Sequence, residues 1–264
     1  MGEVVTRSTG DGVAVLTLNR PDRLNAWTHE MKRVYFDLLE DCAADPDVRV
    51  IVLTGAGRGF CAGADMDELD SVAGGGLEAS AAEAAQDPRP QTFPLSIPKP
   101  IIAAINGPCA GLGFVHAMMC DLRFAAAGAK LTTAFSRRGL IAEHGISWVL
   151  PRVVGPSVAL DLLLSGRIVL AEEAKEMGLV NRVVEPDRLM DETLAYAQDL
   201  AVHCSPASMA TMKRQLYDAL TQELDVALER ANELMLASFG EKDFAEGVAS
   251  FLEKREPSFA PLSR

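Results

Sequence analysis

The sequence predicts an α/β fold, because β-type and helical segments alternate through the first two thirds of the chain. Glycine turns separate several of these segments, and almost only helical patterns follow Ser157. We therefore expect a core with partly parallel strands over residues 1–200. A helical region over residues 201–264 should pack on that core or on a neighbouring subunit. With 264 residues the chain is long enough to bury a large core without covalent staples.

The first elements are a hairpin and a long helix. Residues 13–18 are apolar and β-branched, and the Gly10-Asp11-Gly12 segment before them is typical of a hairpin turn. Thr28 is an N-cap residue type, so a helix should begin after it and end at Asp45-Pro46-Asp47. A buried strand is expected over residues 48–53.

The middle of the chain contains an insert and a long uncharged run. Residues 71–91 are dominated by Gly, Ala, Glu, Pro and Gln, which indicates a flexible insert with a short helix. Residues 101–119 carry no charge and approach membrane-spanning length, but Asn106, Pro108 and His116 lie within them. A strand, a glycine turn and a buried helix explain this run better than a membrane span.

The remaining elements are a strand at 122–126, a short strand at 180–184 and two amphipathic stretches. The first stretch covers residues 206–237 and the second covers residues 243–254. Both have enough apolar surface to need a packing partner.

Composition excludes several classes of protein. The chain has 37 acidic and 25 basic residues, a net charge of −12, which argues against a general nucleic-acid binder. Its five cysteines form no CxxC pair, so neither a disulfide framework nor a compact zinc site is expected. Reduced thiols and the lack of a secretory-type N-terminus favour a cytoplasmic protein without a metal, nucleic-acid or membrane partner.

Two glycine turns are the candidate chemical sites. Residues 58–66 and residues 105–113 each follow a buried strand and open a helix. Backbone N–H groups at such turns bind oxyanions, although either turn alone also fits a tight surface loop. Neither turn matches GxGxxG or a Walker loop, so a nucleotide fold is poorly supported. Together, the two turns would place two N–H donors around one carbonyl oxygen.

The order of these motifs resembles the crotonase superfamily, the enoyl-CoA hydratase/isomerase family. The matching segments are Leu18-Asn19-Arg20-Pro21, Leu24-Asn25-Ala26, Phe60 to Asp65, Asn106 to Gly113, Met118 to Asp121, and residues 243–255. The resemblance implies a spiral of ββα units with a C-terminal helical region and assembly as trimers or hexamers. It also implies an acyl-CoA thioester as substrate, with coenzyme A as part of that substrate and no separate cofactor.

The resemblance assigns roles to backbone groups. It implies that the N–H groups of Ala62 and Leu112 form the oxyanion hole, with Leu112 in place of the usual glycine. The Leu112 N–H remains usable if the backbone there does not need a positive φ. The coenzyme A arm is expected along Ala62, Gly63, Ala64 and Asp65 and near Arg23 and Leu24. Arg23 is equally consistent with a solvated surface charge.

Departures from the family pattern bear on the reaction. The two glutamates of family hydratases are replaced by Val115 and Phe135, so the usual acid–base pair for adding water is missing. Glu143 matches an aspartate of dienoyl-CoA and ring-acting acyl-CoA isomerases, which implies one proton-transfer carboxylate. Glu143 is also consistent with a helix cap or an arginine partner.

Nearby polar residues receive more modest roles. His116 should point away from the cavity because one residue rotates a helix by about 100° relative to Val115. His144 is left open. Asp67 and Glu68 follow the first turn and could face the acyl pocket, but a solvated short helix is the favoured expectation.

We expect an acyl-CoA enzyme that stabilises an enolate and shifts a double bond through Glu143. The alternatives are a 2-enoyl-CoA hydratase and an acyl-CoA-binding protein with little catalysis. The side chain of Glu143 separates them: facing the thioester pocket it favours the enzyme, and tied in a surface ion pair it favours the binding protein.

Overall fold

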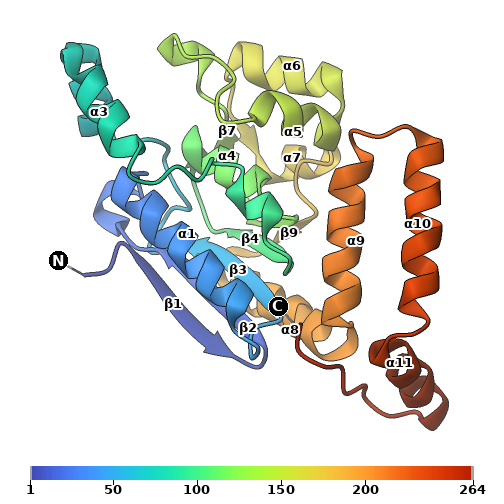
Figure 1. The fold of residues 1–264 in the computed structure, drawn as a ribbon. Helices are drawn as coiled ribbons and strands as arrows, with labels where there is room; N and C mark the ends of the chain where they lie inside the picture. Colours follow the sequence, from blue (N-terminus) through green and yellow to red (C-terminus); the bar gives the residue numbers. More distant parts are fainter. Residues whose placement is uncertain (1, 263–264) are drawn as a thin grey trace.

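The computed structural model describes residues 2–262 and is built around a six-stranded sheet (Figure 1). The strands of this sheet, in spatial order, are β1 (Val5–Gly10), β2 (Val13–Leu18), β3 (Val50–Gly55), β4 (Ile101–Ile105), β6 (Leu122–Ala126) and β9 (Arg182–Val184). β1 and β2 are antiparallel, and every other neighbouring pair is parallel. The predicted partly parallel α/β core is therefore confirmed.

A smaller sheet stands beside the first. It contains β5 (Cys109–Ala110), β7 (Lys130–Thr132) and β8 (Val169–Leu170), in that order. β5 belongs to the second glycine turn, and β8 is a two-residue strand that the sequence pattern did not indicate.

The predicted hairpin joins β1 to β2. Asp11 and Gly12 both have positive φ, 50° and 77°, as a two-residue turn between twisted antiparallel strands requires. The strand expected at 48–53 begins two residues later, at Val50. Residues 45–48 are instead used to leave the helix, since the Val48 N–H donates to the Asp45 carbonyl at 3.2 Å.

Two helices cover the sheet. α1 (His29–Ala44) begins at Thr28, whose hydroxyl accepts the Met31 N–H at 3.1 Å, and it contacts β1 and β2. α8 (Leu189–His203) contacts β2, β3, β4 and β6. All residues of β3 and β4 are buried, as expected for the apolar runs at residues 50–53 and 101–105.

The insert at 71–91 contains a kinked helical segment and one short helix, as expected. α2 (Met66–Ser71) leads through a wide turn with Gly75 at φ 100° into α3 (Leu77–Ala84). The other helices of the core are α4 (Leu112–Met118), α5 (Ile146–Val154), α6 (Pro156–Ser165) and α7 (Ala171–Glu176). Among residues 2–262, no helix is both long enough and apolar enough to cross a bilayer.

Three helices form the C-terminal arm, residues 206–253: α9 (Pro206–Ala219), α10 (Leu224–Ser238) and α11 (Lys242–Glu253). The single stretch predicted over 206–237 is wrong, because α9 and α10 are two helices lying side by side (Figure 1). The turn between them is closed by the Thr221 N–H and hydroxyl, which both donate to the Asp218 carbonyl. That turn contains neither Gly nor Pro, so no helix-breaking residue marks it in the sequence.

Candidate active site

A cavity of about 600 Å³ lies where both glycine turns meet the start of α1, the α2–α3 insert and the segment before α5. Its walls include residues from five separate parts of the chain: 23–32, 62–72, 80–91, 111–112 and 133–144. The volume and the mixed polar and apolar walls are those of a small-molecule site.

Glycines bring the two turns into direct contact. Gly63 and Gly111 have φ values of 104° and 50°, and a Cβ on Gly63 would lie 3.6 Å from the Gly111 Cα. A Cβ on Gly113 would lie 2.3 Å from the Cys61 carbonyl oxygen, which no side chain tolerates. The close approach of the two backbones therefore depends on glycine at these positions.

The side chain of Asn25 holds the first glycine turn, residues 58–66, in place. Its buried side-chain amide donates to the Gly59 carbonyl at 2.8 Å and to the Phe60 carbonyl at 3.1 Å. Its oxygen accepts the Arg20 N–H at 2.9 Å. The Leu24-Asn25-Ala26 motif thus positions the turn, a role that the sequence pattern alone did not specify.

The predicted oxyanion donor Ala62 is wrong. Its N–H donates to the Leu24 carbonyl at 3.0 Å and is not available to a ligand. Leu24 itself contributes this carbonyl and is not among the cavity-lining residues. The segment 61–65 bends at Gly63, so spacing along the sequence did not reveal which N–H groups face the cavity.

Ala64 supplies a free donor instead. Trp27 donates to the Gly63 carbonyl and accepts from Asp65, so the N–H of Ala64 points away from Trp27, towards the second turn. Within residues 2–262 the Ala64 N–H has no acceptor. The Gly63 N–H also lacks one there, but Gly63 is buried whereas Ala64 is partly exposed.

Leu112 supplies the second donor. It is the first residue of α4, where an N–H has no partner inside the helix. Gly111 takes the positive φ and Leu112 does not, so leucine fits this position without strain. No acceptor for the Leu112 N–H occurs in the described part of the chain. Ala64 and Leu112 both line the cavity.

Glu143 lines the same cavity, half-buried. The sequence left open a helix cap or an arginine partner, and neither is present among residues 2–262. Its one ionic neighbour is His144, with Nε2 3.6 Å from the carboxylate. Burial lowers the pKa of His144, although Glu143 opposes this effect. His144 is therefore neutral near pH 7 and leaves the carboxylate charge uncompensated.

The positions of the absent hydratase glutamates differ from each other. Phe135 lines the cavity and is buried. Val115 is buried in the core and does not line the cavity, so only Phe135 of the two apolar replacements faces the cavity.

His116 is a core residue, as predicted. Its ring stacks on Trp27 with centroids 3.8 Å apart, and its Nε2 lies 2.9 Å from the Gln91 side-chain oxygen. Burial lowers the pKa of His116 to about 3, so the ring is neutral and takes no part in proton exchange near pH 7.

Glu68 is a second carboxylate in the cavity, the less favoured of its two predicted settings. Glu68, expected on a solvated helix, lines the cavity opposite His29, whose Nδ1 lies 3.3 Å from its carboxylate. Burial raises the pKa of Glu68, while His29 draws it down. Asp67 is exposed as expected.

The residues predicted to hold coenzyme A divide into two groups. Arg23 lies at the cavity rim, largely exposed, 3.3 Å from the Asp67 carboxylate. Asp65 is buried: it caps α2 through the Asp67 N–H and pairs with Arg20 at 2.8 Å. Burial opposes ionisation of Asp65, but these hydrogen bonds lower its pKa overall. Its role in the free protein is to fix the first turn.

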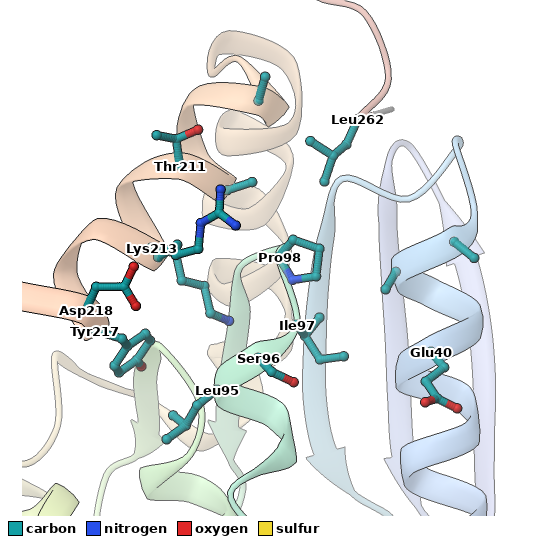
Figure 2. Close-up of a pocket in the computed structure, with 15 residues that line it drawn as sticks. Glu40, Leu95, Ser96, Ile97, Pro98, Thr211, Lys213, Tyr217, Asp218 and Leu262 are labelled. Atoms are coloured by element: carbon teal, nitrogen blue, oxygen red, sulfur yellow. The ribbon is translucent and has the colours of Figure 1, made fainter. Parts of the chain in front are cut away.

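A second cavity, of about 790 Å³, separates α1 from the C-terminal arm (Figure 2). Lys213 and Tyr217 of α9 approach the segment 95–98 there. The Lys213 ammonium is 2.7 Å from the Asp121 carboxylate, which also accepts the Ile101 N–H at 2.7 Å. These polar groups are already paired with one another, so they anchor α9 to the core, and Asp121 has a structural role.

Comparison with known proteins agrees with this arrangement. The family model for enoyl-CoA hydratase/isomerase matches residues 8–261. A 1,2-epoxyphenylacetyl-CoA isomerase from Escherichia coli strain K12 is 38% identical over 264 residues, covering 98% of this chain and 99% of the relative. An (E)-benzylidenesuccinyl-CoA hydratase from Thauera aromatica is 35% identical over 256 residues, covering 97% and 98%.

Solved structures show the same fold. The crystal structure of an enoyl-CoA hydratase from Bacillus anthracis superposes with a TM-score of 0.90 at 28% identity, covering 97% of this chain and 99% of that one. An enoyl-CoA hydratase from Mycobacterium marinum is 52% identical with a TM-score of 0.70, covering 82% and 98%. The chain therefore belongs to the enoyl-CoA hydratase/isomerase family and has the crotonase fold that its motifs predicted.

Proposed function

We propose that the protein is a double-bond isomerase of acyl-CoA thioesters that uses Glu143 as its proton-transfer group. The observation that carries this proposal is the placement of the Glu143 carboxylate in the cavity that also holds the unpartnered N–H groups of Ala64 and Leu112. An arginine-bound Glu143 would have argued for a binding protein instead.

The oxyanion hole has a simple task in this mechanism. The thioester carbonyl oxygen accepts hydrogen bonds from the N–H groups of Ala64 and Leu112, at about 2.7–3.1 Å. As a carbon-bound proton leaves, the electron pair of the broken C–H bond delocalises onto this oxygen to form an enolate. Fixed backbone donors stabilise the developing charge without having to reorient.

Glu143 moves the proton. Its carboxylate takes a proton from one carbon of the acyl chain and, as a carboxylic acid, returns it to another carbon of the same conjugated system. The double bond shifts, and Glu143 is restored to its initial state. One carboxylate suffices because nothing is added to the substrate, and Phe135 excludes water from the adjacent wall.

Hydration is the second candidate, and Glu68 is the observation that favours it. Two carboxylates, Glu143 and Glu68, line the cavity, and addition of water needs one group to activate water and one to deliver a proton. The hydratase from Thauera aromatica is 35% identical to this chain, close to the 38% of the isomerase from Escherichia coli. Isomerisation remains the main proposal because both positions at which the family's hydratases carry glutamates are apolar here, Val115 and Phe135.

The experiment is a Glu143→Gln substitution tested on enoyl-, dienoyl- and aromatic acyl-CoA thioesters. We expect isomerase turnover to fall about 10²–10⁴-fold with thioester binding largely intact, the usual contribution of a general acid–base group. Glu30→Gln, an exposed carboxylate on α1 outside the cavity, is the matched control.

Other outcomes select the alternatives. Efficient crotonyl-CoA hydration that is lost in both Glu143→Gln and Glu68→Gln would establish the hydratase. Tight binding of all thioesters without turnover of any would establish the acyl-CoA-binding protein.

The wider setting of the enzyme is also a proposal. We place the coenzyme A arm along Gly63 and Ala64 and past the rim at Arg23, with no separate cofactor. The protein would act in the cytoplasm, consistent with its five free cysteines, as a homotrimer or hexamer assembled through the C-terminal arm.

A further inference from the structure

We infer that the acyl group of the substrate carries a hydrogen-bond-accepting oxygen, which Lys32 and Trp27 recognise in the wall of the cavity. This inference rests on the proposed function, since it concerns the acyl part of the same acyl-CoA site. A plain hydrocarbon chain would need only apolar walls.

Lys32 is the first observation. It lines the cavity although the residue is only 8% exposed, and a lysine so deeply buried normally faces a carboxylate. Among residues 2–262, no carboxylate lies within 4 Å of its ammonium. Its one hydrogen-bond acceptor is the Asp87 backbone carbonyl at 2.7 Å, and the ammonium lies 5.6 Å from the centroid of the Phe36 ring. Two of its three protons therefore have no hydrogen-bond acceptor there.

The nearest acid is already occupied. The Asp87 carboxylate is bound by the Arg89 guanidinium at 2.8 Å, and Arg89 also reaches Asp37 and Glu40. Burial lowers the pKa of Lys32, an effect that Asp87 opposes and Arg89 strengthens. The charge of Lys32 is therefore left for a group that enters the cavity.

Trp27 is the second, independent observation. It is 2% exposed, lines the same cavity, and its indole N–H has no acceptor in the described part of the chain. Buried indole N–H groups are nearly always hydrogen-bonded, because an unmade bond is costly. A substrate oxygen would complete the hydrogen bonding of both donors.

Three saturated acyl-CoA probes of equal chain length test the inference by calorimetry: hexanoyl-CoA, its analogue with a ketone near the chain end, and its analogue with a terminal carboxylate. Saturated chains cannot isomerise, so affinity is measured independently of the reaction. We expect both oxygenated probes to bind the wild type at least about tenfold more tightly than hexanoyl-CoA. Tighter binding of the carboxylate probe than of the ketone probe would identify an anionic group on the natural acyl chain. Equal affinities of the two probes would identify a neutral oxygen.

Variants assign the donors. Lys32→Met should remove the preference for the carboxylate probe, and Trp27→Phe should remove the preference for the ketone probe. Lys175 is an exposed lysine outside the cavity, so the control variant Lys175→Met should retain both preferences. Because Lys32 also holds the Asp87 carbonyl, melting temperatures accompany each variant, and the wild-type preference decides even if a variant fails to fold.

Hexanoyl-CoA binding as tightly as the oxygenated probes would overturn the inference and leave the isomerase proposal intact. Selective binding by a protein that turns over no substrate would support the inference and refute the isomerase. Failure of every probe to bind would overturn both.

Discussion

The main sheet and the C-terminal arm use apolar residues in opposite ways. Large side chains such as Phe36 and Leu53 in the core are fully buried, whereas Phe251 of α11 and Leu224 of α10 are 83% and 82% exposed. Helix α1, which carries Phe36 and packs on the sheet, and the helices of the arm both have apolar residues at helical spacing. The spacing of apolar residues along the sequence therefore indicates that a helix has an apolar face, but it does not indicate which surface covers that face.

The arm is held to the core by a few polar anchors. Lys213 of α9 reaches Asp121, and Ser205, just before α9, donates to Asp243 of α11. The Arg49 guanidinium bonds to the carbonyl of Phe259, in the segment after the arm, at 2.7 Å. These contacts fix its direction and leave its apolar stripes uncovered. Exposed apolar area of this extent normally marks a protein–protein interface.

The largest expected difference between the two regions comes from truncating one phenylalanine in each. Phe36→Ala should lower the free energy of unfolding by about 3–5 kcal/mol because it leaves a cavity in the core. Phe251→Ala should act only through assembly, so its effect should grow with protein concentration while that of Phe36→Ala does not. Urea unfolding at several protein concentrations makes the distinction; concentration-independent loss for both would place Phe251 in an intramolecular core.

The next prediction concerns assembly itself. Leu216→Asp puts a charge on the exposed apolar stripe of α9 and should weaken the oligomer roughly 30-fold or more, the scale of an interface hot spot. Light scattering of the variant beside Gln222→Asp, in the turn after α9, provides the measurement and its control. A wild type that is a stable monomer at micromolar concentration would refute assembly through the arm.

The free energy of unfolding should fall at acidic pH because of a buried histidine in the core, His116. Because burial lowers the pKa of His116 to about 3, the unfolded chain binds a proton below its ordinary value near 6.5 while the folded chain does not. Stability is therefore full above pH 6.5 and falls as the pH drops towards 3, by about 2 kcal/mol at pH 5. His116→Gln should remove this part of the loss between pH 7 and pH 5 in urea titrations. The exposed His203→Gln should not.

The smallest effect contrasts two helix starts. Thr28 caps α1 with its side chain, whereas Glu223 at the start of α10 makes no such bond. Thr28→Ala should cost about 1 kcal/mol, and Glu223→Ser should add up to about 1 kcal/mol. Thermal unfolding of both variants tests this, and a loss from Glu223→Ser would mean that the glutamate serves the arm in another way.

Local chemistry explains which features the sequence predicted. The Asp11-Gly12 turn, the Thr28 cap and the strands at 101–105 and 122–126 depend on neighbouring residues, and all were predictable. The break at 220–223 was not, because it is closed by a threonine and an aspartate that also occur within helices. The sequence indicated that the arm needs a packing partner but left open the core or a neighbouring subunit, because apolar spacing does not identify the partner surface.

The site shows the same limit. Glu143 and the two turns could be placed by motif, but the choice between Ala62 and Ala64 depends on how Gly63 turns the backbone against Trp27 and Gly111. Glu68 was predicted only as the less favoured pocket residue, and Lys32 was missed because its contact comes from the segment around Asp87, far away in sequence. Tertiary geometry, and not residue type, decided these roles.

The contact between Gly63 and Gly111 has one more consequence. In the proposed mechanism it sets the spacing of the Ala64 and Leu112 donors through backbone atoms, with the Asn25 side chain holding the first turn in place. No side chain of the cavity wall is then needed to polarise the thioester. The walls that hold Glu143, Glu68 and Lys32 are then free to diverge without disturbing that step. A scaffold of this kind separates activation of the substrate from the choice of what happens to it, which is why relatives of similar identity carry the names of a hydratase and an isomerase.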